Sequence, residues 1–134
     1  MKDLIVFHKV GDDEVFQNKR IVMNHEKLKC YQELLIVAEE IAKMVARWPR
    51  GYAYLTDQIT RAIISAVLNL CEGNGKRSSS HAERRRFFQI SLGSITETSS
   101  GLDLAYSFRL TTQKERDFLK SHLKSAYVKI NALP

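Results

Sequence analysis

The sequence predicts an all-α protein, an antiparallel up-down-up-down four-helix bundle, and three observations predict it. Apolar residues recur at intervals of three and four over four separate segments. The segments between them are short, and short connections make consecutive helices antiparallel neighbours. The 134 residues include only six glycines and two prolines, with 44% hydrophobic and 27% charged residues. That composition is typical of one globular domain and excludes a disordered chain, a collagen-like repeat and a disulfide scaffold.

The first two predicted helices differ in how their apolar residues are arranged. The first runs from an N-cap at Asn24 to a stop at Pro49 and carries one apolar stripe. The second, from about Thr56 to Glu72, is apolar nearly all round. A helix that is apolar on most faces is buried on most faces, so this helix predicts a partner subunit. The stripe of the first helix consists of Tyr31, Leu34, Leu35, Ala38, Ile41, Ala42, Val45 and Trp48.

Two capping boxes predict where the third and fourth helices begin. Ser80 and Glu83 have the spacing at which a hydroxyl and a carboxylate each satisfy a free backbone N–H, and the third helix continues from there to about Phe108. Thr112 and Glu115 repeat the spacing. The fourth helix therefore begins at Thr112.

Small residues inside the helices predict close packing. Gly93 and Gly101 lie two turns apart in the third helix, where glycine lowers helix stability unless a neighbouring backbone approaches closely. Cys30 and Cys71 lie in apolar patterns without the spacing of a metal site. We expect both cysteines to be core residues.

Residues 1–23 differ from the four-helix bundle domain, residues 24–134. Two runs rich in β-branched and aromatic residues flank the turn-forming Gly11-Asp12-Asp13, which predicts a short N-terminal β-hairpin extension. Alternatively, translation starts at Met23 and the preceding residues are an extension without a defined role. The basic and acidic residues of this segment cancel, so the formal net charge of +6 belongs to the helical part.

Signals for membranes, metals and enzymes are weak. The first ten residues lack a signal-peptide pattern, and the longest nearly uncharged run, Ala62 to Cys71, is about half of the ~20 residues that a spanning helix needs. No glutamate is followed three residues later by a histidine, as a di-metal bundle requires. We therefore expect a cytoplasmic protein without membrane contact, bound metal, cofactor or enzymatic activity.

A line of polar residues follows one face of the second helix. The members are Gln58, Arg61, Ser65, Asn69 and Glu72. Buried charges need partners, and Ser94 or Glu97 of the third helix are natural candidates. We interpret these seven residues as a buried polar network that fixes the register between helices. The alternative is a polar ligand or metal pocket.

Basic residues concentrate between the second and third helices. They are Lys76, Arg77, Arg84, Arg85 and Arg86, with Glu83 as the one acidic neighbour. Such a cluster at a helix N-terminus predicts binding of phosphate groups. Three consecutive arginines span about 200° of the helix, so they cannot all face one ligand.

The second and third helices carry the motifs of a known family. The residues are Gln58-Ile59-Thr60-Arg61-Ala62, Ser65, Asn69, Glu72-Gly73, Arg77-Ser78, Phe87-Phe88, Leu92-Gly93-Ser94 and Glu97. With them the chain resembles the bacterial 23S rRNA-intervening-sequence proteins over most of residues 25–110. It departs from the usual pattern at Ala66-Val67, where Ile-Pro is common, and at Leu70-Cys71, where Ile-Ala is common.

The resemblance implies an antiparallel four-helix bundle that assembles into a ring-like homopentamer without established enzymatic activity. A related branch, the accessory variability determinant proteins of diversity-generating retroelements, implies nucleic acid and a reverse transcriptase as partners. The chain is more similar to the first branch.

Three functions remain open from the sequence. The first is an oligomeric bundle that binds RNA or DNA weakly specifically through Lys76, Arg77 and Arg84 to Arg86. The second is an interaction scaffold for an acidic protein partner, with the hairpin adding a strand to it. The third is a small-molecule or metal enzyme that uses Arg61, Asn69, Glu72 and Glu97.

Overall fold

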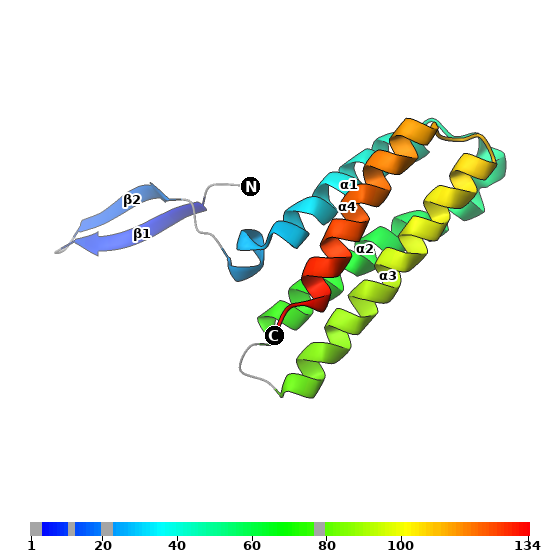
Figure 1. Ribbon diagram of the computed structural model, residues 1–134. Coiled ribbons are helices and arrows are strands. Elements are labelled where there is room, and N and C mark those ends of the chain that lie inside the picture. Colours follow the sequence, from blue (N-terminus) through cyan, green and yellow to red (C-terminus); the bar gives the residue numbers. More distant parts are fainter. Residues whose placement is uncertain (1–3, 11–12, 20–22, 77–79) are drawn as a thin grey trace.

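The computed structural model describes residues 4–10, 13–19, 23–76 and 80–134 (Figure 1). Four long helices dominate it, as the sequence predicts. They are α1 (Lys29–Val45), α2 (Ala53–Gly75), α3 (His81–Ser107) and α4 (Gln113–Asn131). Two 3₁₀ turns precede α1 and α2, namely η1 (Asn24–Lys27) and η2 (Arg50–Tyr52).

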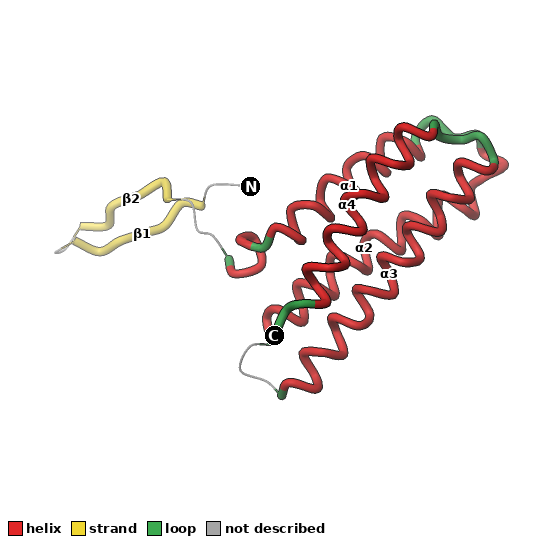
Figure 2. Tube along the Cα trace, in the orientation of Figure 1, coloured by secondary structure: helices red, strands yellow, loops and turns green. Residues whose placement is uncertain are grey.

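Two strands lie N-terminal to the helices (Figure 2). The strands β1 (Leu4–Val10) and β2 (Asp13–Lys19) pair in antiparallel register, with Phe7 opposite Phe16. A two-stranded sheet leaves both of its edges unpaired by its own strands.

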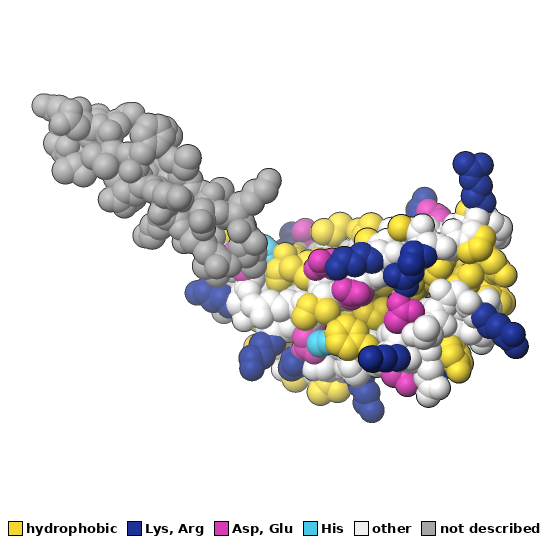
Figure 3. All heavy atoms as spheres, turned by 90° about the horizontal axis from the view of Figure 1, so that it is seen from above, with side chains coloured by type: hydrophobic (Ala, Val, Ile, Leu, Met, Phe, Trp, Pro, Cys, Tyr) yellow, Lys and Arg dark blue, Asp and Glu magenta, His cyan; other side chains and the backbone are white. Residues whose placement is uncertain are grey.

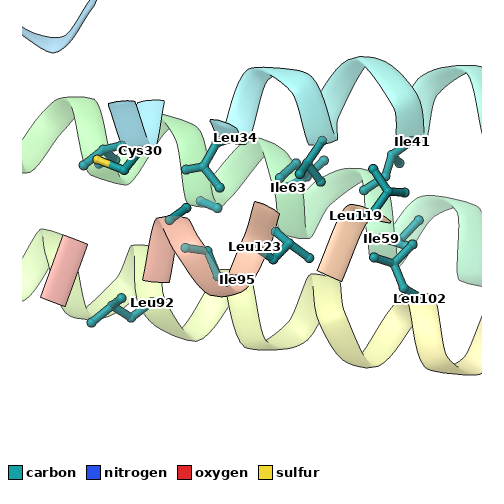
Figure 4. Packing of buried hydrophobic residues seen from close by; sticks show 14 of the residues in the cluster. Cys30, Leu34, Ile41, Ile59, Ile63, Leu92, Ile95, Leu102, Leu119 and Leu123 are labelled. Atoms are coloured by element: carbon teal, nitrogen blue, oxygen red, sulfur yellow. The ribbon is translucent and has the colours of Figure 1, made fainter. Parts of the chain in front are cut away.

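The four helices enclose one apolar core. α1 packs on α2 and α4, and α3 packs on the same two helices. Side chains from all four helices converge between them (Figure 4). The largest fully buried ones are Phe88, Leu34, Ile41, Met44, Ile59, Ile63, Leu70, Leu102, Leu119, Leu123, Ile130 and Val37. Burial of this apolar area is the main force that holds the helices together.

The start and the buried stripe of α1 differ from the prediction. Asn24 begins the 3₁₀ turn and caps no α-helix; a Glu26 carboxylate oxygen accepts the Met23 N–H at 2.9 Å instead. Val37 and Met44 are buried, whereas Leu35 is 38% exposed. The apolar residues of α1 form two overlapping stripes, and packing against α4 and α2 buries the one that continues from Cys30.

Both capping predictions are confirmed in outline. The Ser80 hydroxyl accepts the Glu83 N–H at 3.2 Å. Thr112 and Glu115 form a complete capping box, with reciprocal hydrogen bonds of 3.1 Å. Glu115 also accepts from Arg47 at 2.6 Å, which ties the end of α1 to the start of α4. The Thr112 N–H first, and then Arg47 and Thr111, hold the pKa of Glu115 below its ordinary value.

The glycines divide into close-contact and open positions. A Cβ on Gly101 would lie 3.1 Å from the Ile59 side chain, so close approach is confirmed there, although a side chain rather than a backbone makes it. The prediction for Gly93 is wrong within one chain, since no neighbouring atom lies within 4 Å of such a Cβ. The tightest contact is at Gly73, where a Cβ would lie 2.7 Å from the Phe88 ring.

Different connections and helix ends meet at the two ends of the helices. At the Arg109 end (residues 46–54 and 106–116), the α1–α2 and α3–α4 connections meet: the Trp48 Nε1 donates to the Leu110 carbonyl at 3.0 Å. The Tyr52 and Phe108 rings lie 5.7 Å apart there. At the Arg84 end (residues 72–76, 80–88 and 129–134), α2 ends, α3 begins and α4 ends.

A helix that crosses a membrane must be both long and apolar. Across the described part of the chain, no helix combines the length and the apolar character that crossing a bilayer requires.

Candidate nucleic-acid interface

The predicted basic residues surround the start of α3. Lys76 lies between two carboxylates, with its Nζ 3.9 Å from Glu72 and 3.8 Å from Glu83. Its side chain is 34% exposed. Arg77 lies outside the described residues. Lys76 is therefore partly neutralised before any ligand arrives.

Arg84 and Arg85 point toward the end of α4. The Arg84 Nε donates to the Pro134 carbonyl at 2.7 Å, and the Arg85 guanidinium approaches the Leu133 carbonyl and the Asn131 side chain at 3.4 Å. Helix C-termini carry unsatisfied carbonyls and partial negative charge, so two arginines are favourable neighbours for α4. Both guanidinium groups also lie over the Phe88 ring, at 5.1 and 5.9 Å from its centre.

Arg86 is exposed, whereas Arg84 and Arg85 are half-buried. That the three arginines cannot all face one ligand stays a prediction from helix geometry. A guanidinium has five N–H donors, so Arg84 and Arg85 retain donors for phosphate while they hold the end of α4. The described cations around the start of α3 are Lys76, Arg84, Arg85 and Arg86.

The polar line on α2 is not a buried network within one chain, which corrects the prediction. Arg61 has a side chain that is 76% exposed, and it pairs with Asp57 of its own helix at 3.0 Å. Glu72 is 56% exposed in its side chain, and Glu97 is also exposed. The helix is rotated so that Ile59, Ile63, Ala66 and Leu70 face the core. Arg61 and Glu72 consequently face outward.

Ser65 of this line joins α2 to Ser94 of α3, and Asn69 bonds to Ser65 within α2. The Ser94 hydroxyl donates to the Ser65 hydroxyl at 2.7 Å, and the Asn69 amide donates to the Ser65 carbonyl at 2.9 Å. Ser91, which the sequence did not single out, is fully buried and donates to the Ala66 carbonyl at 2.7 Å. Gln58 is half-buried at the groove described below. Of the seven predicted residues, only Ser65, Asn69 and Ser94 hydrogen-bond to one another.

A second group of cations lies at the Arg109 end, and sequence reasoning missed it. Residues 46–54 and 106–116 contain five basic residues and one acidic residue. The group is spread over two connections that are far apart in the sequence, so only the fold brings it together. Basic side chains project at both ends of the helices in the face shown in Figure 3.

The arginine at position 109 has an uncommon backbone conformation. Its φ is 61°, and it is the one non-glycine residue with positive φ in the described part of the chain. The Leu110 N–H donates to the Ala105 carbonyl and the Arg109 N–H to the Tyr106 carbonyl, at 2.8 and 2.9 Å. These two hydrogen bonds form a Schellman motif, in which glycine is the usual residue at this position.

An apolar stripe on α2 is exposed. Ile64 and Leu68 are 50% and 62% exposed and lie one turn apart. The Asp57–Arg61 ion pair lies one turn before them, and the Glu72–Lys76 pair one turn after. An apolar centre with a charged rim is the usual composition of a protein–protein interface.

Groups for covalent or metal chemistry are few in the described residues. Burial raises the pKa of both the Cys30 and the Cys71 thiol, so neither is an activated nucleophile. Cys30 is a core residue as predicted, while Cys71 is half-buried. Residues 4–10, 13–19, 23–76 and 80–134 contain no cluster of three metal-binding side chains.

Comparisons with known proteins agree with the motifs of α2 and α3. A family model described as 23S rRNA-intervening sequence protein matches residues 26–132. The match covers all four helices and begins after the two strands. No curated protein matches the chain.

Proposed function

The chain belongs to the 23S rRNA-intervening sequence protein family, and from this premise we propose that it is a non-enzymatic, homo-oligomeric bundle that binds RNA or DNA. In this proposal the four helices form an antiparallel up-down-up-down bundle with an N-terminal β-hairpin, and the oligomer is a pentamer in the cytoplasm. Binding uses backbone phosphates and is weakly sequence-specific, because direct base reading needs side chains built to reach base edges.

The exposed apolar stripe on α2 supports the oligomer. Ile64 and Leu68 together form the apolar centre of a face whose rim consists of two ion pairs. Exposed apolar patches with polar rims mark interaction surfaces. A second copy that covers this face would remove both side chains from water.

The cations of the Arg84 end carry the nucleic-acid part of the proposal. Lys76, Arg84, Arg85 and Arg86 lie around the start of α3, and Arg86 is exposed. If about two phosphates are bound per subunit, five subunits give a slope of log K against log salt near −9 for duplex DNA, whereas one subunit gives about −2. Assembly of five subunits would therefore give a much higher affinity for nucleic acid than one subunit has.

Sedimentation of two matched double variants tests the oligomer. Ile64→Ser/Leu68→Ser should sediment as a smaller species than the wild type at micromolar concentration. Leu35→Ser/Ile36→Ser removes two exposed apolar residues from α1, at 38% and 39% exposure, and should leave the mass unchanged. A wild type that sediments as a folded single chain would refute the oligomer.

Binding of labelled RNA and duplex DNA against salt concentration tests the nucleic-acid function. Arg84→Ala/Arg85→Ala/Arg86→Ala should bind more weakly and with a shallower salt slope than the wild type. Because Arg84 and Arg85 also hold the end of α4, thermal unfolding of the variant must accompany the titration, and Arg86→Ala alone should show part of the effect. Negligible binding by the wild type at low salt removes the proposal.

The β1–β2 pairing supports a second candidate, a scaffold for an acidic protein such as a reverse transcriptase. A two-stranded sheet has open edges to which a partner can add a strand. Deletion of residues 1–22 distinguishes the candidates: loss of partner capture with intact assembly and intact nucleic-acid binding supports the scaffold.

A further inference from the structure

Two arginines at the Arg109 end are available to an anionic ligand. Arg50 and Arg109 are exposed, and neither makes an ion pair or a side-chain hydrogen bond with another described residue. Two of the other three cations of this end differ: Arg47 is paired with Glu115, and Arg116 with Asp117. The one acidic residue of this end is therefore already engaged.

Exposed aromatic rings accompany these arginines. Phe108, directly before Arg109, is 47% exposed, and Tyr54, at the start of α2, is 80% exposed. The centres of the Phe108 and Tyr52 rings lie 5.7 Å apart, and this ring contact joins the two connections that carry Arg50 and Arg109. Aromatic rings that alternate with cations are the elements of a surface for single-stranded nucleic acid, because unpaired bases stack on rings while phosphates bind cations.

A groove opens beside these rings, between the start of α2 and the end of α3. It has a volume of about 420 Å³, and Tyr54, Leu55, Ile59, Leu104 and Phe108 supply its apolar lining. Gln58 contributes an amide to the lining, Glu97 a carboxylate and Ser100 a hydroxyl. The amide oxygen of Gln58 and the carboxylate of Glu97 can accept hydrogen bonds from base N–H groups, including the N3–H of thymine, which a duplex keeps in its own pairs and an unpaired strand exposes.

We propose that the Arg109 end binds single-stranded nucleic acid, with bases against Phe108 and Tyr54 in this groove and phosphates on Arg50 and Arg109. The inference rests on the proposed nucleic-acid function and adds a second surface and a strand preference to it. A second copy that met this end symmetrically would be a poorer occupant, since two identical ends would bring four such arginines together. A head-to-tail contact between copies is an outcome that the variants below distinguish.

The backbone conformation of Arg109 allows its side chain to be removed without strain in the turn. Its φ of 61° is a conformation that glycine adopts freely, so Arg109→Gly removes the cation without disturbing the turn. The variant Arg50→Ala/Arg109→Gly should therefore melt no lower than the wild type. Lys29→Ala/Lys124→Ala is the matched control, because it also removes two exposed cations without an ion pair to a described residue, but from α1 and α4 away from the Arg109 end.

The experiment is a fluorescence titration with three 20-mer probes: single-stranded dT, the same strand with abasic sites, and a duplex. The wild type should bind the dT strand more tightly than both other probes. Arg50→Ala/Arg109→Gly should bind it about tenfold more weakly, with a salt slope shallower by about 0.7 for each phosphate that the variant no longer binds. The control variant should bind nearly as the wild type does.

Two further variants separate the possible failures. Tyr54→Ala/Phe108→Ala should weaken binding of the dT strand but not of the abasic strand. If that variant changes the sedimenting mass and leaves binding intact, the rings belong to a contact between copies and the inference is refuted. If Arg50→Ala/Arg109→Gly binds as the wild type while Arg86→Ala does not, the inference fails and the proposed function stands. No binding of any probe refutes both.

Discussion

The contact between α2 and α3 and the contact between α1 and α4 are built by different means. α2 and α3 approach closely through small residues: Gly73 faces the Phe88 ring, Gly101 faces Ile59, and the Ser91 hydroxyl reaches the Ala66 carbonyl. α1 and α4 share the core but add ion pairs near the surface. Those pairs are Lys129 with Glu33 and Arg47 with Glu115, and the His122 Nδ1 also lies 3.6 Å from a Glu33 carboxylate oxygen.

This difference teaches where the fold is sensitive to size and where it is sensitive to charge. Protein interiors are close-packed, so a single added methyl group is felt in the α2–α3 contact. Ion pairs near water contribute little each and respond to salt and pH. Added methyl groups should therefore affect the α2–α3 contact most, and changes of charge, salt or pH the α1–α4 contact.

The largest effect should come from Gly73→Ala. The new Cβ would lie 2.7 Å from the Phe88 ring, which is itself fully buried, so the ring or the helix must move. Overpacking of this kind costs about 1–3 kcal/mol of the free energy of unfolding, measurable by urea denaturation.

Gly93→Ala is the control on the same helix pair. No atom lies within 4 Å of its added Cβ, so the higher helix propensity of alanine should raise stability by about 0.5–1 kcal/mol. If Gly93→Ala instead lowers stability or the sedimenting mass, a second copy covers this position. If both variants behave alike, the α2–α3 contact is not limited by size.

A smaller effect is expected from the Glu33 and Lys129 pair between α1 and α4. Lys129 donates to Glu33 and to Ser125, and its side chain is 42% exposed. A double-mutant cycle with Glu33→Gln and Lys129→Met should give a coupling free energy of about 0.5–1 kcal/mol that falls at high salt. A salt-independent coupling would show that packing, not charge, joins the pair.

The fold was predictable where the signal is local. Apolar periodicity and the capping spacings of Ser80 and Thr112 depend on neighbours three or four residues away, and the structure confirms the four helices that they predict. The rotation of each helix about its own axis decides which residues it buries, and this rotation does not follow from neighbours three or four residues away. Leu35 and Val37 are both apolar, and only packing against other helices decides that Val37 is buried.

The candidate site was less predictable for the same reason. The charges of Arg61 and Glu72 look costly beside apolar neighbours, but Asp57 and Lys76 lie one helical turn away and pair with them at the surface. Arg50 and Arg109 are far apart in the sequence, and the Tyr52–Phe108 and Trp48–Leu110 contacts bring their connections together. Tertiary contacts therefore determine which charged residues form a surface.

The smallest predicted effect is the pH dependence of the α1–α4 contact. Burial acts to raise the pKa of Glu33, but hydrogen bonds from Lys129 and Ser125 outweigh it and the pKa lies below its ordinary value. A carboxyl with a lowered pKa in the folded state stabilises the fold above its unfolded pKa, ~4.3, and this stabilisation is lost as the pH falls through the folded pKa. The wild type should hold its stability from pH 7 to 5 and lose it below.

Glu33→Gln should be less stable than the wild type at pH 7 and should lose less stability between pH 5 and 3. The difference between the two chains should stay under about 1 kcal/mol, since the partner Lys129 is partly solvated. Urea denaturation at each pH measures it. Parallel pH profiles for the two chains would mean that the ion pair contributes nothing across this range, and the α1–α4 contact would then depend on packing as fully as the α2–α3 contact does.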